Sequence, residues 1–133
     1  MKTFITLLTA AMIMACNTNH NHDHLGIDLN DGEKWVINSE MTPHIQEAHQ
    51  IFKDYVSSGN EDYKTLANNL KQQNKRLIKS CTMKGKSHDE LHKWLHPHIG
   101  LIDQLADAEN LESANEIIEK LEDSFNAFHV YFN

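Results

Sequence analysis

One stretch of the sequence decides the fold: residues 111–132, LESANEIIEKLEDSFNAFHVYF. Its apolar residues recur at spacings of three and four; they are Leu111, Ala114, Ile118, Leu121, Phe125, Phe128 and Phe132. A period near 3.6 residues places such residues along one face of an α-helix. The stretch therefore predicts an amphipathic helix that packs its apolar face against other helices.

Three earlier segments have the same period. Their apolar stripes are Met41, Ile45, Ala48, Phe52 and Tyr55; Tyr63, Leu66, Ala67, Leu70, Leu77, Ile78 and Cys81; and Leu91, Leu95, Ile99, Ile102 and Leu105. Asn38 or Ser39 is expected to cap the first segment, and residues 87–90 (SHDE) to form a capping box for the third. Pro97 is expected to kink the third segment or to mark an irregular turn. Because the connections are short, neighbouring helices should be antiparallel. The sequence predicts an all-α protein, with an up-down-up-down four-helix bundle over residues 38–133.

Residues 25–37, LGIDLNDGEKWVI, precede the bundle and lack helical periodicity. Ile27 and Leu29 alternate with polar residues, and Asp31-Gly32 is a two-residue turn signal. We expect an extended arm or a very short hairpin that Trp35 packs against the bundle.

The amino terminus has the layout of a secretory signal over residues 1–15: Lys2, an apolar run and a small residue. The run is too short to cross a bilayer, which takes about 20 apolar residues. Ile13-Met14-Ala15-Cys16 resembles the lipobox of bacterial lipoproteins, which implies that Cys16 is lipidated and becomes the new amino terminus. The alternative is an ordinary cleaved signal with Cys16 in or just after it.

Removing fifteen of the 133 residues leaves 118, and losing Lys2 changes the net charge from −7 to −8. An acidic chain repels phosphates, so nucleic acid is not an expected partner. A lipid anchor would attach the protein to a membrane of the cell envelope, inner or outer, without spanning it, and the domain would face the periplasm.

Residues 16–37 would then comprise the lipidated cysteine, a His-rich tether and the arm. The tether, residues 17–24 (NTNHNHDH), is polar and of low complexity. Its residues His20, His22 and His24 either capture metal ions or belong to a solvated spacer. Lipidation of Cys16 would leave Cys81 as the one free thiol of an exported chain.

The predicted topology brings soft and imidazole ligands to one end of the bundle. The ligand set favoured by helical geometry is Met41, Cys81, His88 and His129, and the second choices are His44, Met83 and His92. Thiolate, thioether and imidazole suit copper, above all Cu(I), and could also hold zinc. His96 is expected to face solvent, and His98 to hydrogen-bond with Asn74 across the core. The alternative is that Cys and Met fill the core and that ten histidines reach this end by chance.

Two further resemblances concern the mature chain. The His-rich tether, the Asp-Gly-Glu-Lys-Trp arm and the helical domain are similar to small exported bacterial proteins of unassigned function. Met41 early in the first helix and His129 late in the fourth resemble the haem ligands of periplasmic four-helix b-type cytochromes, which implies haem b as a possible cofactor. Cys81 departs from that pattern, and no CxxCH motif for covalent haem is present.

No nucleophile elbow, phosphate loop or paired-carboxylate motif indicates an enzyme. We therefore expect a membrane-tethered periplasmic protein that binds a transition metal, copper first, for sequestration, delivery or sensing. The alternatives are a b-type haem electron carrier, and a lipoprotein that binds another envelope protein and no metal.

Overall fold

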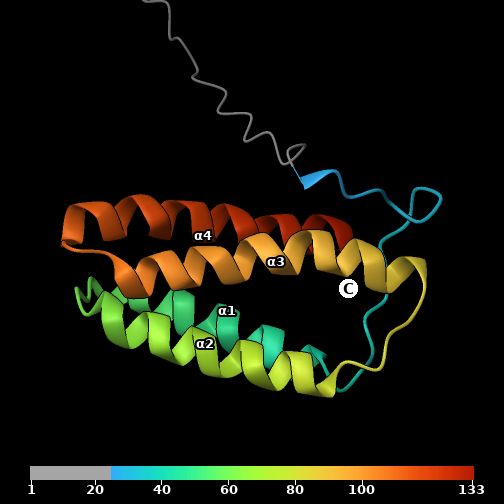
Figure 1. Ribbon diagram of the computed structural model, residues 1–133, viewed down its shortest axis with the longest axis horizontal. Coiled ribbons are helices and arrows are strands. Elements are labelled where there is room, and N and C mark those ends of the chain that lie inside the picture. Colours follow the sequence, from blue (N-terminus) through green and yellow to red (C-terminus); the bar gives the residue numbers. More distant parts are fainter. Residues whose placement is uncertain (1–24) are drawn as a thin grey trace, which may run out of the picture.

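A computed structural model describes residues 25–133, which form four helices. These are α1 Thr42–Ser58, α2 Tyr63–Ser80, α3 Lys86–Asp107 and α4 Leu111–Tyr131. Each helix packs against the next in the chain, with α1 and α2 in one layer and α3 and α4 in the other (Figure 1). The predicted all-α four-helix bundle is confirmed. The predicted signal peptide, Cys16 and the His-rich tether lie outside the described residues.

Most of the periodic residues form the core, as the sequence predicts, but Ile78, predicted on the apolar face of the second helix, is half exposed. Buried positions on α4, for example, are Ala114, Leu121, Phe125, Ala127 and Phe128. Trp94 was not in the predicted stripe of the third helix, yet its side chain is fully buried and its Nε1–H donates to the carbonyl of Ser124 at 2.8 Å. The hydrogen bond satisfies the indole nitrogen, which allows this large ring to fill the space between α3 and α4.

Helices α2 and α4 have side-chain caps, because Asp62 accepts from the backbone N–H of Thr65 and Asn110 from that of Ser113. The expected caps of α1 and α3 are wrong. α1 begins after Met41, and α3 begins after Gly85, in both cases without a side-chain cap. α3 also continues through Pro97 as one helix from Lys86 to Asp107.

The two side chains expected to cap α1 and α3 make tertiary contacts instead. Asn38 donates to the carbonyl of Ser80 at 3.0 Å and accepts from the backbone N–H of Thr82 at 3.1 Å. The carboxylate of Glu90, 3% exposed, accepts from the backbone N–H of Asp28 at 2.9 Å and from Lys93 Nζ. Both residues therefore join distant segments.

The arm forms a short hairpin, one of the two predicted forms. Asn30 and Glu33 pair across a turn in which Asp31 and Gly32 have positive φ angles of 52° and 90°. Trp35 is buried, and its backbone N–H donates to the carbonyl of Tyr131 at 2.8 Å, next to a parallel bridge to Phe132. The arm is thereby attached to the carboxyl end of α4.

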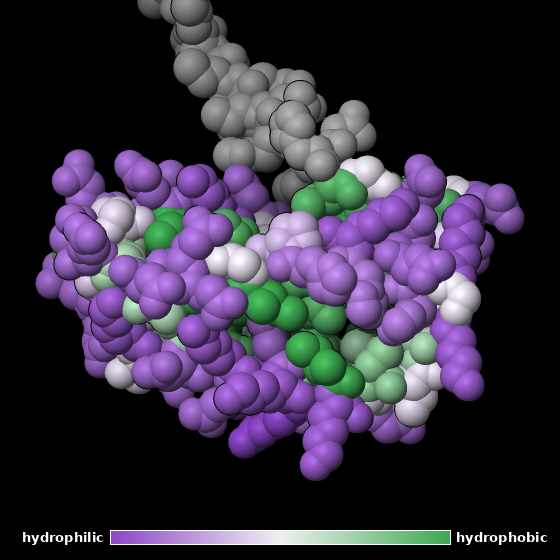
Figure 2. All heavy atoms as spheres, in the orientation of Figure 1, coloured by the Kyte–Doolittle hydropathy of each residue, from purple (hydrophilic) through white to green (hydrophobic). Residues whose placement is uncertain are grey.

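No helix among residues 25–133 is long and apolar enough to cross a membrane. The face seen in Figure 2 is mostly hydrophilic, with an apolar strip where α2 and α3 meet. Ile78, half exposed at 50%, lines the space between α2 and α3.

Candidate metal centre

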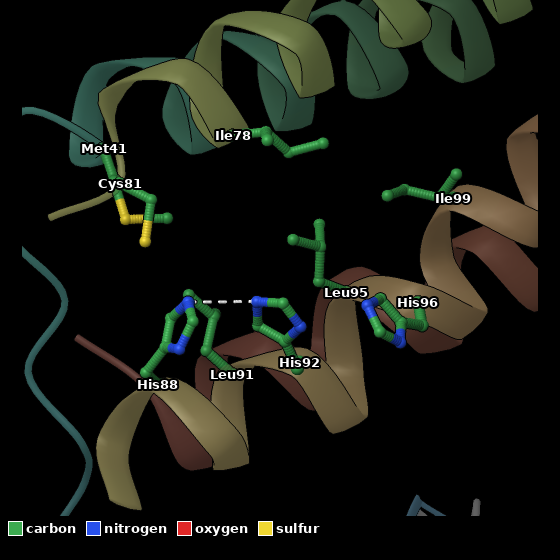
Figure 3. Close-up of a pocket in the computed structure, with 9 residues that line it drawn as sticks. All are labelled: Met41, Ile78, Cys81, His88, Leu91, His92, Leu95, His96 and Ile99. Carbon is green, nitrogen blue, oxygen red and sulfur yellow. Dashed lines mark hydrogen bonds between the residues drawn. The ribbon is translucent and has the colours of Figure 1, made fainter. Parts of the chain in front are cut away.

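A groove of about 300 Å³ lies between the carboxyl end of α2 and the first turns of α3. Two sulfur-containing residues and three histidines line it (Figure 3). The other lining residues are aliphatic: Ile78, Leu91, Leu95 and Ile99. The groove therefore offers soft and imidazole donors inside apolar walls.

The sulfur atoms come from the two ends that the α1–α2 hairpin brings together. Met41 directly precedes α1 and is 0% exposed, while Cys81 directly follows α2 and is half buried. Cys81 is a free thiol, and both sulfur atoms face the groove in Figure 3. Asn38 bonds to the backbone of Ser80 and Thr82, the residues on either side of Cys81, and so restrains the backbone at Cys81.

The imidazoles come from successive turns of α3. Nε2 of His88 lies 3.0 Å from Nε2 of His92, so one ring donates a hydrogen bond and the other accepts it. The rings of His92 and His96 are 4.7 Å apart between centroids. Partial burial lowers the pKa of His92, and His88 and His96 lower it further, against an opposing effect of Asp89. A neutral ring, the form that binds metals, is thus favoured at His92.

The separation of the two ring nitrogens is compatible with a shared metal ion. Two nitrogens about 2.0–2.1 Å from one ion, at angles of roughly 90–110°, lie about 2.9–3.4 Å apart. The observed 3.0 Å falls in that range. Among residues 25–133, no three His, Cys, Asp or Glu side chains already converge on one metal position. A full ligand set would therefore need the thioether of Met41 or a rotation of the Cys81 side chain.

The structure brings together three of the four preferred ligands, Met41, Cys81 and His88, and adds the second choice His92. It does not bring His129 to this groove, because Nε2 of His129 lies 3.0 Å from Nδ1 of His49, between α4 and α1. The other second choices, His44 and Met83, do not line the groove; Met83 packs against the core.

His96 is exposed, as expected, yet it lines the groove, which the sequence reasoning missed. The signal was available in the spacing of His88, His92 and His96, which recur every fourth residue along one side of a helix.

The expected pairing of His98 with Asn74 is wrong. Nδ1 of His98 lies 2.9 Å from the hydroxyl of Ser124 on α4, and its ring stacks on Trp94. The side chain is fully buried, and burial lowers the pKa of His98 to about 3. His98 is thus a neutral core residue between α3 and α4, separate from the groove.

The groove is defined by a thiol and a thioether on one side and a pair of imidazoles on the other. Comparisons of the chain with protein-family models, curated proteins and solved structures gave no match.

Proposed function

We propose that this protein is a membrane-tethered, periplasm-facing lipoprotein that binds copper as Cu(I) for sequestration, delivery or sensing. The ligands are Cys81, Met41, His88 and His92. The observation that carries the proposal is one groove that contains both sulfur side chains and a pair of imidazole nitrogens 3.0 Å apart.

The donor set favours Cu(I) over zinc. Thiolate and thioether ligands select Cu(I), whereas structural zinc sites use four thiolate, imidazole or carboxylate ligands. Of the described residues that line the groove, none is a carboxylate. Besides Cys81, His88 and His92, the buried Met41 supplies a thioether, a ligand that Cu(I) prefers and that structural zinc sites do not use.

The apolar walls support the same choice. Leu91 and Leu95 are buried beneath the imidazoles, and Ile78 and Ile99 border the opening. Such walls limit access of water, which suits a Cu(I) ion whose ligands are all protein side chains. Cys81 would lose its proton when it binds the ion, so copper affinity should fall as the pH is lowered.

The test uses the full chain with Cys16→Ser, so that Cys81 is its one thiol. One equivalent of Cu(I) should slow alkylation of Cys81 by a maleimide at least ten-fold, because a metal-bound thiolate is shielded. His88→Gln, His92→Gln and Met41→Leu should each weaken copper affinity about ten-fold or more.

His44→Gln is the matched control, since His44 lies near the same end of the bundle but does not line the groove. Equal alkylation rates with and without Cu(I), in a chain shown to be folded by circular dichroism, would refute the copper site.

Haem b is the alternative cofactor, and it would need Met41 and His129 as a pair of axial ligands. Met41 faces the groove with Cys81, whereas His129 contacts His49. The geometry therefore favours a metal ion, and a Soret band in the protein purified from its native host would decide for haem.

A further inference from the structure

A second pair of imidazoles joins α1 to α4, away from the Cys81 groove. Nε2 of His129 lies 3.0 Å from Nδ1 of His49, across 80 residues of sequence. We propose that this pair is a second metal site, which takes a borderline divalent cation such as Zn²⁺. It contains no sulfur ligand and does not depend on the copper proposal.

The distance between the two nitrogens is the first argument. As at His88 and His92, a value of 3.0 Å fits two nitrogens that share one ion at about 2.0–2.1 Å. Here the two rings come from different helices, so an ion would link the first helix of the bundle to the last. Water would complete the coordination shell, since the site opens to solvent.

The orientation of the rings is the second argument. The imidazole of His49 stacks on Phe125, with centroids 4.9 Å apart and 10° between the planes. The ring of His129 lies edge-on to Phe128 at 5.6 Å. Phe125 is buried and holds the ring of His49 in place, whereas His129 is exposed and can turn to direct its lone pair toward an ion.

The surroundings of the pair affect cation binding in two opposite ways: they keep the imidazoles unprotonated, and they place lysine charges nearby. Burial is the main cause that lowers the pKa of both histidines. At His49, the nearby His129 and Lys53 lower the pKa further. At His129, Lys34 and Lys53 do the same. Unprotonated rings are available to a metal at neutral pH. The same two lysines repel a cation, but both are exposed, so solvent and salt screen that repulsion.

The repulsion gives the site a distinctive signature. Removing the charge of Lys53 should strengthen Zn²⁺ binding a few-fold at low ionic strength, because a neighbouring positive charge is lost. A pair of histidines that only bond to each other would show no such response to Lys53→Gln.

The experiment is Zn²⁺ titration calorimetry at pH 8 on the full chain, with competing ligands removed. The background substitutions are Cys16→Ser, His20→Asn, His22→Asn, His24→Asn, Cys81→Ser and His92→Gln. One Zn²⁺ per chain should bind and raise the Tm. His49→Gln and His129→Gln should each abolish that binding and the Tm increase, while His44→Gln should retain both.

Failure of the background chain to bind Zn²⁺, or equal binding by the His49→Gln and His129→Gln chains, would overturn the proposal. An unchanged affinity in Lys53→Gln would also count against it. Because Cys81 and His92 are replaced throughout, none of these results bears on the Cu(I) groove.

Discussion

Among the described histidines, His98 should make the largest contribution to the destabilisation of this bundle by acid. Its ring is fully buried, stacks on Trp94 and bonds through Nδ1 to Ser124, while Nε2 has no hydrogen-bond partner among the described residues. A proton on this ring would place a charge in the core without a counter-ion. Burial accordingly lowers the pKa of His98 to about 3 from its usual value of 6.5.

The sign and size of the effect follow from proton linkage. Because the folded-state pKa is depressed, the neutral ring contributes its full stability above pH 6.5 and loses it as the pH falls toward 3. pH 5 lies about 1.5 units below the pKa of the histidine in the unfolded chain, so the free energy of unfolding is about 2 kcal/mol lower at pH 5 than well above pH 6.5. At pH 4 the corresponding loss is about 3.4 kcal/mol.

His98→Leu should remove this dependence, because leucine has a similar volume and does not titrate. Urea unfolding followed by circular dichroism at pH 7.5 and pH 5 gives the change in unfolding free energy for each chain. The loss between the two pH values should be about 2 kcal/mol smaller in His98→Leu than in the parent. His49, His92 and His129 titrate in both chains, so their contributions to the change in unfolding free energy cancel in the difference.

The matched control is His96→Gln, which replaces an exposed imidazole two residues away on α3. It should lose nearly as much stability on acidification as the parent, because His96 is only a minor cause of the lowered pKa of His92. Equal losses in the parent and in His98→Leu would show that the buried ring is not the source of acid sensitivity, and would refute the reasoning.

Three further outcomes are expected. Glu90→Ala should cost about 2–3 kcal/mol in urea unfolding and expose the arm to proteases, because Lys93 and the N–H of Asp28 lose a buried carboxylate; unchanged stability and protease resistance would contradict this. Trp94→Phe should cost about 1–3 kcal/mol, since it leaves the carbonyl of Ser124 without its indole donor, and a change within error would be inconsistent with that bond. Cys16→Ala should abolish membrane fractionation, and a variant that still partitions with membranes at the parent's mobility would rule out lipidation.

The helices could be predicted from the sequence because their signal is local. Apolar spacing from Leu111 to Phe132 depends only on the helical period, and the Asp31-Gly32 turn depends only on two residues that tolerate positive φ. Caps were less predictable. Asn38 and Glu90 had suitable positions for capping, but each makes contacts with a segment more than 40 residues away in the sequence. A polar side chain takes the best partner within reach, and distant partners are not visible in a local pattern.

The candidate metal ligands were likewise predictable from the sequence only in part. The placement of Met41, Cys81 and His88 at one end of the bundle followed from the order of helices and the short connections, and the structure brings them to one groove. His129 was expected there too, because it flanks the apolar stripe of the fourth helix about as closely as His88 flanks that of the third.

The sequence by itself determined the four helices, their buried faces and which ends lie together. Only the tertiary structure decided that His88 and His92 meet Cys81 whereas His129 meets His49. A residue beside the middle of an apolar stripe points toward one of the two neighbouring helices, and the helical period gives the angle but does not identify that neighbour. The neighbour depends on the direction in which the four helices turn around the bundle axis, and packing of the whole core sets that direction.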